Sequence, residues 1–411
     1  MQEILLTYKE VLKELEQTKP NNHLLLGNGF NLSLGVKTSY KNIYEVMKQN
    51  NKDYEGIDTK NFDLELFIGE CKDNIKEENN PYAKFMKLFF HNKIKLDFMK
   101  AVTQIVAKEI KKIRQLENEG IYLLFKQFDT FFTLNYDPFL YQLLMSFKKP
   151  EKNFGLAFRN SLSGIRRFIE NENDETFKKI EKAYKDGFLT INIDNIPQET
   201  KLNLLNKAEF TREINKYFKG KNSKKELKKM IDCIWEQKED DKKKVIENID
   251  DGYRYTLFGD ELIYQNPETQ NLFFLHGAFH LYKGRKCIQK ITQESDKALY
   301  NRIEEVVENA EENLICVFSD TNKEAEIMKD EYLKNGLNKI EKLNGSLLIL
   351  GSSLADNDSH IFNRIKKSKI TKIYISSFKK DLEKNSIKAN KFFNNKEIIF
   401  FNTETISYIK E

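Results

Sequence analysis

His23–Asn31, with the sequence HLLLGNGFN, joins a short apolar run to a turn that contains two glycines. Continuous apolar runs of this length are typical of strands buried in a parallel sheet. The two glycines let the backbone turn sharply and approach a ligand closely where the strand ends. This stretch therefore predicts a strand-to-helix turn at the ligand-binding edge of an open α/β sheet.

Further apolar runs of the same kind follow along the chain, and helical patterns separate most of them. The runs cover residues 131–134, 272–275, 314–318, 347–350, 373–375 and 398–401, and the helix candidates between the later runs cover 295–311, 322–342, 359–367 and 379–393. Strands that alternate with helices favour parallel pairing through right-handed crossovers. We therefore predict an α/β fold with a doubly wound, mostly parallel Rossmann-like sheet of six or seven strands.

Two stretches do not alternate. Residues 60–128 have a helical pattern throughout, and residues 148–250 are charge-dense with weaker apolar patterning. The second stretch interrupts the predicted sheet between its second and third strands. The sequence thus predicts a sheet domain formed by residues 1–147 and 251–411, with a large charged helical subdomain inserted at 148–250.

Composition excludes several classes of protein. Among 411 residues, 40% are hydrophobic and 32% are charged, and the net charge of +5 is too small to indicate nucleic-acid binding. No apolar stretch approaches the ~20 residues of a membrane helix, and the first residues lack the pattern of a signal peptide. The four cysteines are far apart and include no CxxC pair, which argues against zinc and a disulfide framework. We expect a cytoplasmic protein without a membrane partner.

Four polar clusters follow predicted strands, at the positions where doubly wound sheets bind ligands. A histidine accepts protons near neutral pH, an asparagine orients a substrate, and small residues leave room for a ribose. Each cluster also has a structural explanation: a plain turn, a helix cap at Asp137, a hydrogen-bonded core histidine, or a cap after residue 355. The candidates are Gly27, Asn28, Gly29, Phe30 and Asn31; Asn135 and Asp137; His276; and Gly351, Ser352 and Ser353, with Ser376 as a further feature.

In their order along the chain these clusters resemble the sirtuin superfamily. Sirtuins carry a Gly-x-Gly turn, then Asn-x-Asp, then His-Gly, then a Gly-x-Ser-Leu segment. The chain lacks the four-cysteine zinc ribbon and the Pro-Asp-Phe-Arg element of sirtuin deacylases. The wording LLGNGFN and FLHGAFH is similar to bacterial sirtuin-like domains that hydrolyse NAD in anti-phage defence. Such domains often assemble with a partner such as a hexameric ATPase.

The resemblance implies an NAD+ glycohydrolase that releases nicotinamide and ADP-ribose, with NAD+ as substrate rather than cofactor and no zinc. His276 would be the base, Asn135 would orient the ribose or the water, and Asp137 would contact the nicotinamide amide. The turn 27–31 would hold the diphosphate, and Ser352 and Ser353 would hold the adenosine side. The resemblance also implies a homo-oligomer and a partner ATPase in a defence complex.

Two alternative functions remain open on the sequence alone. The first is a sensor that binds NAD or ADP-ribose without catalysis; the presence of both Asn135 and His276 favours the enzyme. The second is a nucleic-acid-binding component that uses the lysines crowded at 216–229. Acidic residues interrupt and follow these lysines, and mixed charge favours a solvated face over phosphate contacts.

Overall fold

The structure is a computed structural model. It describes residues 5–55, 64–115, 119–147, 246, 249–255, 262–284, 287–291, 301–303, 314–318 and 323–408. By its internal contacts the chain divides into two units: Met1–Met145 with Ile249–Arg254 and Glu261–Glu411, and Ser146–Asn248 with Tyr255–Asp260. Nearly all described residues belong to the first unit. The predicted insertion at 148–250 lies outside the described residues, apart from 246, 249 and 250.

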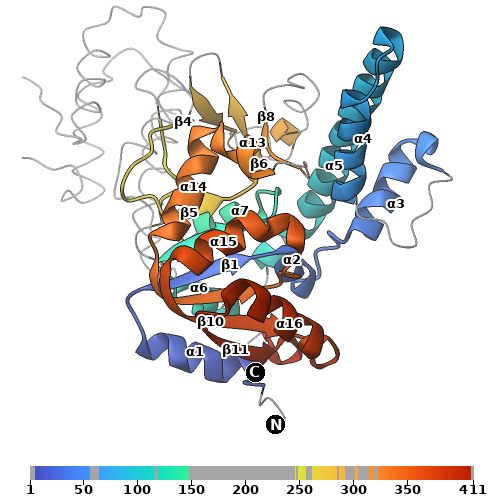
Figure 1. Ribbon diagram of the computed structural model, residues 1–411. Helices are drawn as coiled ribbons and strands as arrows, with labels where there is room; N and C mark the ends of the chain where they lie inside the picture. The colour runs from blue at the N-terminus through green and yellow to red at the C-terminus, as the bar shows by residue number, and fades with distance from the viewer. Residues whose placement is uncertain are drawn as a thin grey trace, which may run out of the picture. The chain divides into compact units, whose positions relative to one another are not determined.

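A six-stranded parallel sheet forms the centre of the first unit (Figure 1). Its strand order is β5-β2-β1-β9-β10-β11, and every pairing is parallel. Six of the seven predicted strands are confirmed here, which establishes an α/β fold. The strands are β1 (Asn22–Leu26), β2 (Thr130–Thr133), β5 (Leu272–Phe274), β9 (Asn344–Leu350), β10 (Lys369–Ser377) and β11 (Glu397–Asn402).

Helices pack on both faces of this sheet. In β2, Phe131 and Phe132 are consecutive and therefore point to opposite faces. The Phe131 ring lies 5.8 Å from that of Phe125 in α6 (Glu119–Phe125). The Phe132 ring stacks on Phe273 at 5.3 Å, and Phe273 lies against Gly336 of α14 (Glu331–Glu341). Because both faces are covered, the strands are apolar throughout rather than alternating.

The remaining helices near the sheet follow their local sequence signals. The N-terminal helix begins at Tyr8, because Thr7 and Glu10 form a capping box and Leu6 bridges to β11 instead. The helix predicted over 322–342 is wrong as a single element, because Asp330 accepts from two backbone N–H groups and starts a second helix. The helix predicted over 359–367 is confirmed. These helices are α1 (Tyr8–Gln17), α2 (Asn28–Ser33), α7 (Phe139–Phe147), α13 (Lys323–Met328), α15 (Ser359–Lys367) and α16 (Leu382–Phe393).

A second sheet, which the sequence does not predict, has the order β3-β4-β7-β6-β8. The pairs β4–β7, β7–β6 and β6–β8 are antiparallel. The prediction that residues 314–318 join the parallel sheet is therefore wrong, because an apolar run has the same pattern in either kind of sheet. The strands are β3 (Tyr253–Tyr255), β4 (Leu262–Tyr264), β6 (Gly277–Lys283), β7 (Ile288–Lys290) and β8 (Leu314–Cys316).

A helical hairpin extends away from the parallel sheet (Figure 1). It consists of α4 (Leu64–Lys76) and α5 (Pro81–Gln115), which pack against one another. α3 (Tyr40–Asn50) packs against the later turns of α5. The helical pattern predicted over 60–128 is thus confirmed for its described part. Among the described residues no helix is both long and apolar enough to cross a membrane.

Candidate functional site

The predicted polar clusters all follow strands of the parallel sheet at one edge. Leu26 of β1 is aligned with Thr133 of β2 and with Leu350 of β9, and Thr133 is aligned with Phe274 of β5. Parallel strands end at the same edge, so the residues that follow them converge. The sheet thus brings together segments that lie more than 300 residues apart in the sequence.

The glycine turn after β1 packs directly on the turn after β9. The Gly27 N–H donates to the Leu350 carbonyl at 2.9 Å, and the Gly29 N–H donates to the Gly351 carbonyl at 2.8 Å. A Cβ at Gly29 would lie 2.6 Å from the Gly351 Cα, and Gly351 has a φ of +73°. All three glycines are therefore required by the contact between the two turns. Because these two N–H groups already have acceptors, the turn offers a diphosphate fewer donors than the sequence indicates.

Two other residues of the first turn are held by the protein itself. Asn28 donates to the Thr38 carbonyl at 2.7 Å and accepts from the Thr38 hydroxyl at 2.5 Å. The Phe30 ring is buried and lies 6.0 Å from Phe125 and 5.9 Å from Tyr408. Asn28 therefore fixes the loop that leads to α3, and Phe30 belongs to the core.

A chain of amide and carboxyl groups connects the ends of β1 and β2. The Asn135 amide donates to the Asn31 side-chain oxygen at 3.2 Å, and the Asn31 amide donates to Asp137 at 2.9 Å. Asp137 also accepts from the backbone N–H of Phe139, so it caps α7. Burial raises the pKa of Asp137 to about 6 despite these hydrogen bonds. Both Asp137 oxygens have protein partners, whereas the described residues offer no donor to the side-chain oxygen of the half-buried Asn135.

His276 lies against the segment that carries Asn135. Its Nδ1 is 3.3 Å from the Leu134 carbonyl oxygen, and its ring is 6.0 Å from that of Tyr136. A carbonyl only accepts, so we assign the proton to Nδ1, which leaves Nε2 as an acceptor. The side chain is only 2% exposed. The position of His276 after the strand agrees with the prediction, but its side chain is buried and not open to a ligand.

The Nε2 atom of His276 faces groups that are not among the candidates from the sequence. It lies 3.3 Å from the Nε2 of His360 and 3.5 Å from an oxygen of Asp358, which also lies 3.4 Å from the Nζ of Lys323. His360 and Asp358 belong to the segment 356–360 after β9, for which the sequence pattern favours a helix cap. The sequence signal that could have identified this pair is a second histidine, His360, in the segment that follows β9.

Both histidines are held in the neutral form at pH 7. Burial, with the charge of Lys323 and the neighbouring His360, lowers the pKa of His276 well below its ordinary value. Burial and Lys323 also lower the pKa of His360 to about 4. In the neutral pair one Nε2 donates to the other, and the lowered pKa values make both imidazoles weaker bases than a free histidine.

The serines near the ends of β9 and β10 have distinct positions. The Ser376 hydroxyl accepts from the Gly351 N–H at 3.0 Å and supports the turn. The Ser352 hydroxyl accepts from the Leu354 N–H at 3.2 Å. Ser353 is exposed, and its carbonyl accepts from Lys388. Ser352 and Ser353 are therefore the members of this cluster that lie at or near the surface.

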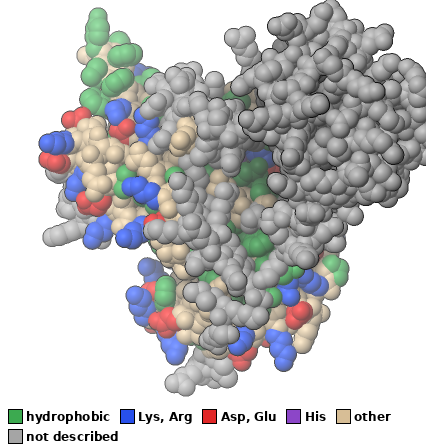
Figure 2. Space-filling model, turned by 180° about the vertical axis from the view of Figure 1, so that it is seen from behind, with side chains coloured by type: hydrophobic (Ala, Val, Ile, Leu, Met, Phe, Trp, Pro, Cys, Tyr) green, Lys and Arg blue, Asp and Glu red, His purple; other side chains and the backbone are tan. Residues whose placement is uncertain are grey.

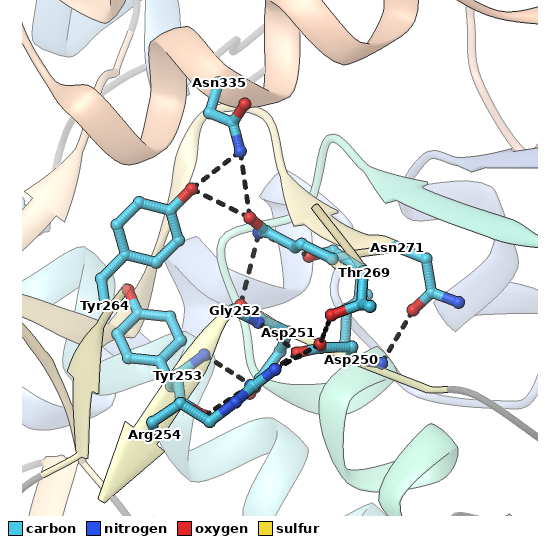
Figure 3. A network of polar contacts seen from close by, with 11 residues as sticks. Asp250, Asp251, Gly252, Tyr253, Arg254, Tyr264, Thr269, Asn271 and Asn335 are labelled. Carbon is cyan, nitrogen blue, oxygen red and sulfur yellow. Dashed lines mark hydrogen bonds and ion pairs between the residues drawn. The ribbon is translucent and has the colours of Figure 1, made fainter. Parts of the chain in front are cut away.

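A second polar network, which no motif indicates, joins β3 and β4 to residues before β5 (Figure 3). Asp250 accepts from Arg254 at 2.8 and 2.5 Å, from the Thr269 hydroxyl at 2.5 Å and from the Gly252 N–H at 2.9 Å. Partial burial opposes ionisation of Asp250, but these hydrogen bonds outweigh it and lower its pKa to about 2. Asn335 of α14 donates to Tyr264 and Gln270 at the other end of the network.

Metal chemistry has no cluster to support it in this part of the chain. Within the described ranges, no group of three or more His, Cys, Asp or Glu side chains is placed to hold a metal ion.

Comparison with protein-family models gives a match to a family. A protein-family model described as a domain of unknown function, DUF4917, matches residues 162–408. No curated protein matches the chain.

Proposed function

The protein belongs to the DUF4917 family, because the match at 162–408 covers more than half of its 411 residues, and we propose that it is an NAD+ glycohydrolase. It would cleave the bond between nicotinamide and ribose with water, and release nicotinamide, ADP-ribose and a proton. The family's description leaves function open, so the proposal rests on the geometry of the site and on the sirtuin-like order of its motifs.

The strand order supports a dinucleotide as the ligand. Numbered along the chain within the parallel sheet, the six strands have the order 3-2-1-4-5-6. This is the order of Rossmann-like dinucleotide-binding folds, in which the ligand lies beyond the carboxyl ends of the strands where the order reverses. Here that reversal falls between β1 and β9, whose turns at 27–31 and 351–354 pack on one another.

One observation carries the catalytic part of the proposal. The segment 134–136 anchors His276 through the Leu134 carbonyl and also presents the Asn135 amide, whose oxygen has no donor among the described residues. This short segment at the sheet edge thus binds the proposed base and carries the proposed orienting group. Cleavage of an N-glycosidic bond through an oxocarbenium-like state needs a base and an orienting group. It needs no strong general acid, because nicotinamide leaves as a neutral molecule.

The remaining residues take supporting roles in the proposed reaction. Neutral His276 accepts the proton of the attacking water, directly or through a ribose hydroxyl, and Asn135 orients the ribose or the water. Asp137 is a positioning residue, because its two oxygens hold Asn31 and the start of α7. Ser352 and Ser353 are assigned to the adenosine side. From the resemblance we further propose that the enzyme depletes NAD+ in bacterial anti-phage defence, with a partner ATPase.

The burial of His276 favours a second candidate function. A side chain that is 2% exposed reaches water only if the site opens. A sensor that binds NAD+ or ADP-ribose in the same place and regulates a partner would need no such opening. The two functions share the ligand and differ in whether nicotinamide is released.

Binding and product analysis of the full chain with NAD+ separate these functions. We expect NAD+ to bind, as measured by calorimetry, and nicotinamide with ADP-ribose to appear on chromatography. Binding without nicotinamide release would identify the sensor. Absence of NAD+ binding would contradict both functions.

Ser352→Arg tests the adenosine side. The larger side chain should fill the space beside the turn at Gly351 and weaken NAD+ binding at least tenfold, while the melting temperature changes little. The control is Ser386→Arg in α16, where the serine is equally half-buried. Equal NAD+ affinity in the two folded variants would show that the adenosine lies elsewhere.

A further inference from the structure

The first turns of α5 expose an unusual amount of apolar surface. Tyr82 is 85% and Phe85 is 67% exposed, and Met86, Phe89 and Phe90 are each about half exposed. The tip of the α4–α5 hairpin projects at the upper left of Figure 2, and hydrophobic side chains gather there. We call these five residues the apolar stripe. Large apolar side chains that gather on a surface indicate a site of interaction.

The stripe occupies one side of the helix. Its members follow the spacing i, i+3, i+4, i+7 and i+8, which places them along one face. The opposite side faces α4: the Lys87 ammonium lies 2.7 Å from Glu78 and 3.5 Å from the Asn74 carbonyl, and His91 is buried. The stripe therefore points away from the only helix that packs on this end of α5 among the described residues.

Further along α5, the same face is covered by another helix, α3. Gln104 lies 18 residues after Met86, which is five turns at 3.6 residues per turn. Its side chain accepts from Asn50 at the end of α3, and the nearby Asp97 accepts from Tyr54 at 2.8 Å. A helix thus packs on this face at 97–104, whereas none of the described helices packs on the same face at the stripe.

We propose that the apolar stripe is the contact surface between two copies of this chain, α5 against α5. The stripe contains no charged residue, so it is complementary to itself, as a two-fold interface requires. Five side chains of this size, half to four-fifths exposed, leave ~600 Å² of apolar surface per copy. Two copies would bury ~1,200 Å², which is at the lower end of stable interfaces.

The charges around the stripe favour a second copy over an anionic membrane. Lys87 is paired with Glu78 on the α4 side, and Lys93 is paired with Asp97 at 2.6 Å. Two of the three lysines at 84–93 are therefore already neutralised by carboxylates, and only Lys84 has no ion pair among the described residues, whereas binding to anionic lipid needs a surplus of positive charge beside the apolar face. The inference does not depend on the proposed reaction.

Sedimentation of the full chain over a wide concentration range tests the proposal. We expect a reversible dimer of twice 48.6 kDa. Phe85→Asp should place a charge inside the contact and leave only monomer, which should melt at the temperature of wild type diluted to monomer because the site is exposed. The matched control is Ile387→Asp, since Ile387 in α16 is also 67% exposed, and this variant should still dimerise.

A cysteine at Met86 provides an independent test. Met86 is at the centre of the stripe, so the two copies of this residue should meet near the two-fold axis. We expect Met86→Cys to form a disulfide-linked dimer under mild oxidation well above the background of the native cysteines.

Three results would overturn the proposal. They are a monomeric wild type at every concentration, a Phe85→Asp variant that still dimerises, and a Met86→Cys variant that links no better than wild type. Binding of the wild type, but not of Phe85→Asp, to phosphatidylserine vesicles would assign the stripe to a lipid surface instead.

Discussion

The polar networks around Asp250 and around His276 differ in the kind of contact that their charged and titratable groups make. Around Asp250, the carboxylate accepts from Arg254, Thr269 and the Gly252 N–H, and these hydrogen bonds lower its pKa to about 2 (Figure 3). Around His276, two imidazole Nε2 atoms face one another at 3.3 Å, and burial lowers the pKa of both rings. A carboxylate that several donors hold is satisfied, whereas buried titratable groups with shifted pKa values gather at functional sites. The difference supports our proposal that the Asp250 network serves stability and the His276 network serves chemistry.

The largest expected difference between the two networks is in the proposed reaction. His276→Ala and Asn135→Ala should each reduce NAD+ cleavage by ~10²-fold or more, the usual scale for a lost base or positioning group. Both variants should retain NAD+ binding, which calorimetry measures alongside the cleavage rate.

The matched control for this test is His280→Ala. His280 is as buried as His276 but lies in β6 of the second sheet. Its ring stacks on that of Tyr141 in α7 at 5.1 Å. Folded His280→Ala protein should therefore cleave NAD+ at the wild-type rate. A His276→Ala variant that matches the wild-type rate would mean that the proposed base is misassigned.

Loss of Asp250 should mainly affect stability. Asp250→Ala removes the acceptor for Arg254, Thr269 and the Gly252 N–H, so we expect unfolding to become easier by about 2.5 kcal/mol. Urea denaturation measures the change. Glu326→Ala is the control, because its ion pair with Lys329 is exposed and should contribute under ~0.5 kcal/mol. Equal losses in the two variants would place the Asp250 network among ordinary surface contacts.

Asp137 and Asp250 should also make the free energy of unfolding depend on pH with opposite signs. The raised pKa of Asp137 means that its stability contribution is present below pH 4 and is lost as the pH rises through about 6. The lowered pKa of Asp250 means that its contribution is present above pH 4 and is lost as the pH falls toward 2. Titration of Asp137 should lower the free energy of unfolding by roughly 2 kcal/mol between pH 4 and 6, since one pKa unit corresponds to about 1.4 kcal/mol. Water that enters the site on ionisation reduces the effect.

Asp137→Asn should remove this slope. Denaturation midpoints measured from pH 4 to 7 for both proteins provide the test. A variant whose midpoints follow the wild-type slope would show that another group is responsible for it.

Prediction from sequence succeeded where one segment carries the whole signal. The runs at 23–26 and 347–350 are apolar throughout and form neighbouring strands, and the helix predicted at 359–367 has the same bounds in the structure. The run at 314–318 has the same composition but pairs with β6, because Gly277, with a φ of +81°, lets the two strands approach. A one-dimensional pattern does not distinguish these partners.

Local sequence is sufficient to indicate the buried strands and to place Asn135, Asp137, His276 and Ser352 after them. These are local properties, set by apolar runs and by the residues that end them. Tertiary contacts were needed to establish which polar groups meet: His276 with His360, Asn31 with Asp137, and Gly29 with Gly351. They also cover the apolar face of α5 at Gln104 and leave it exposed at Phe85. Burial and contact depend on segments distant in sequence, so no local pattern contains them.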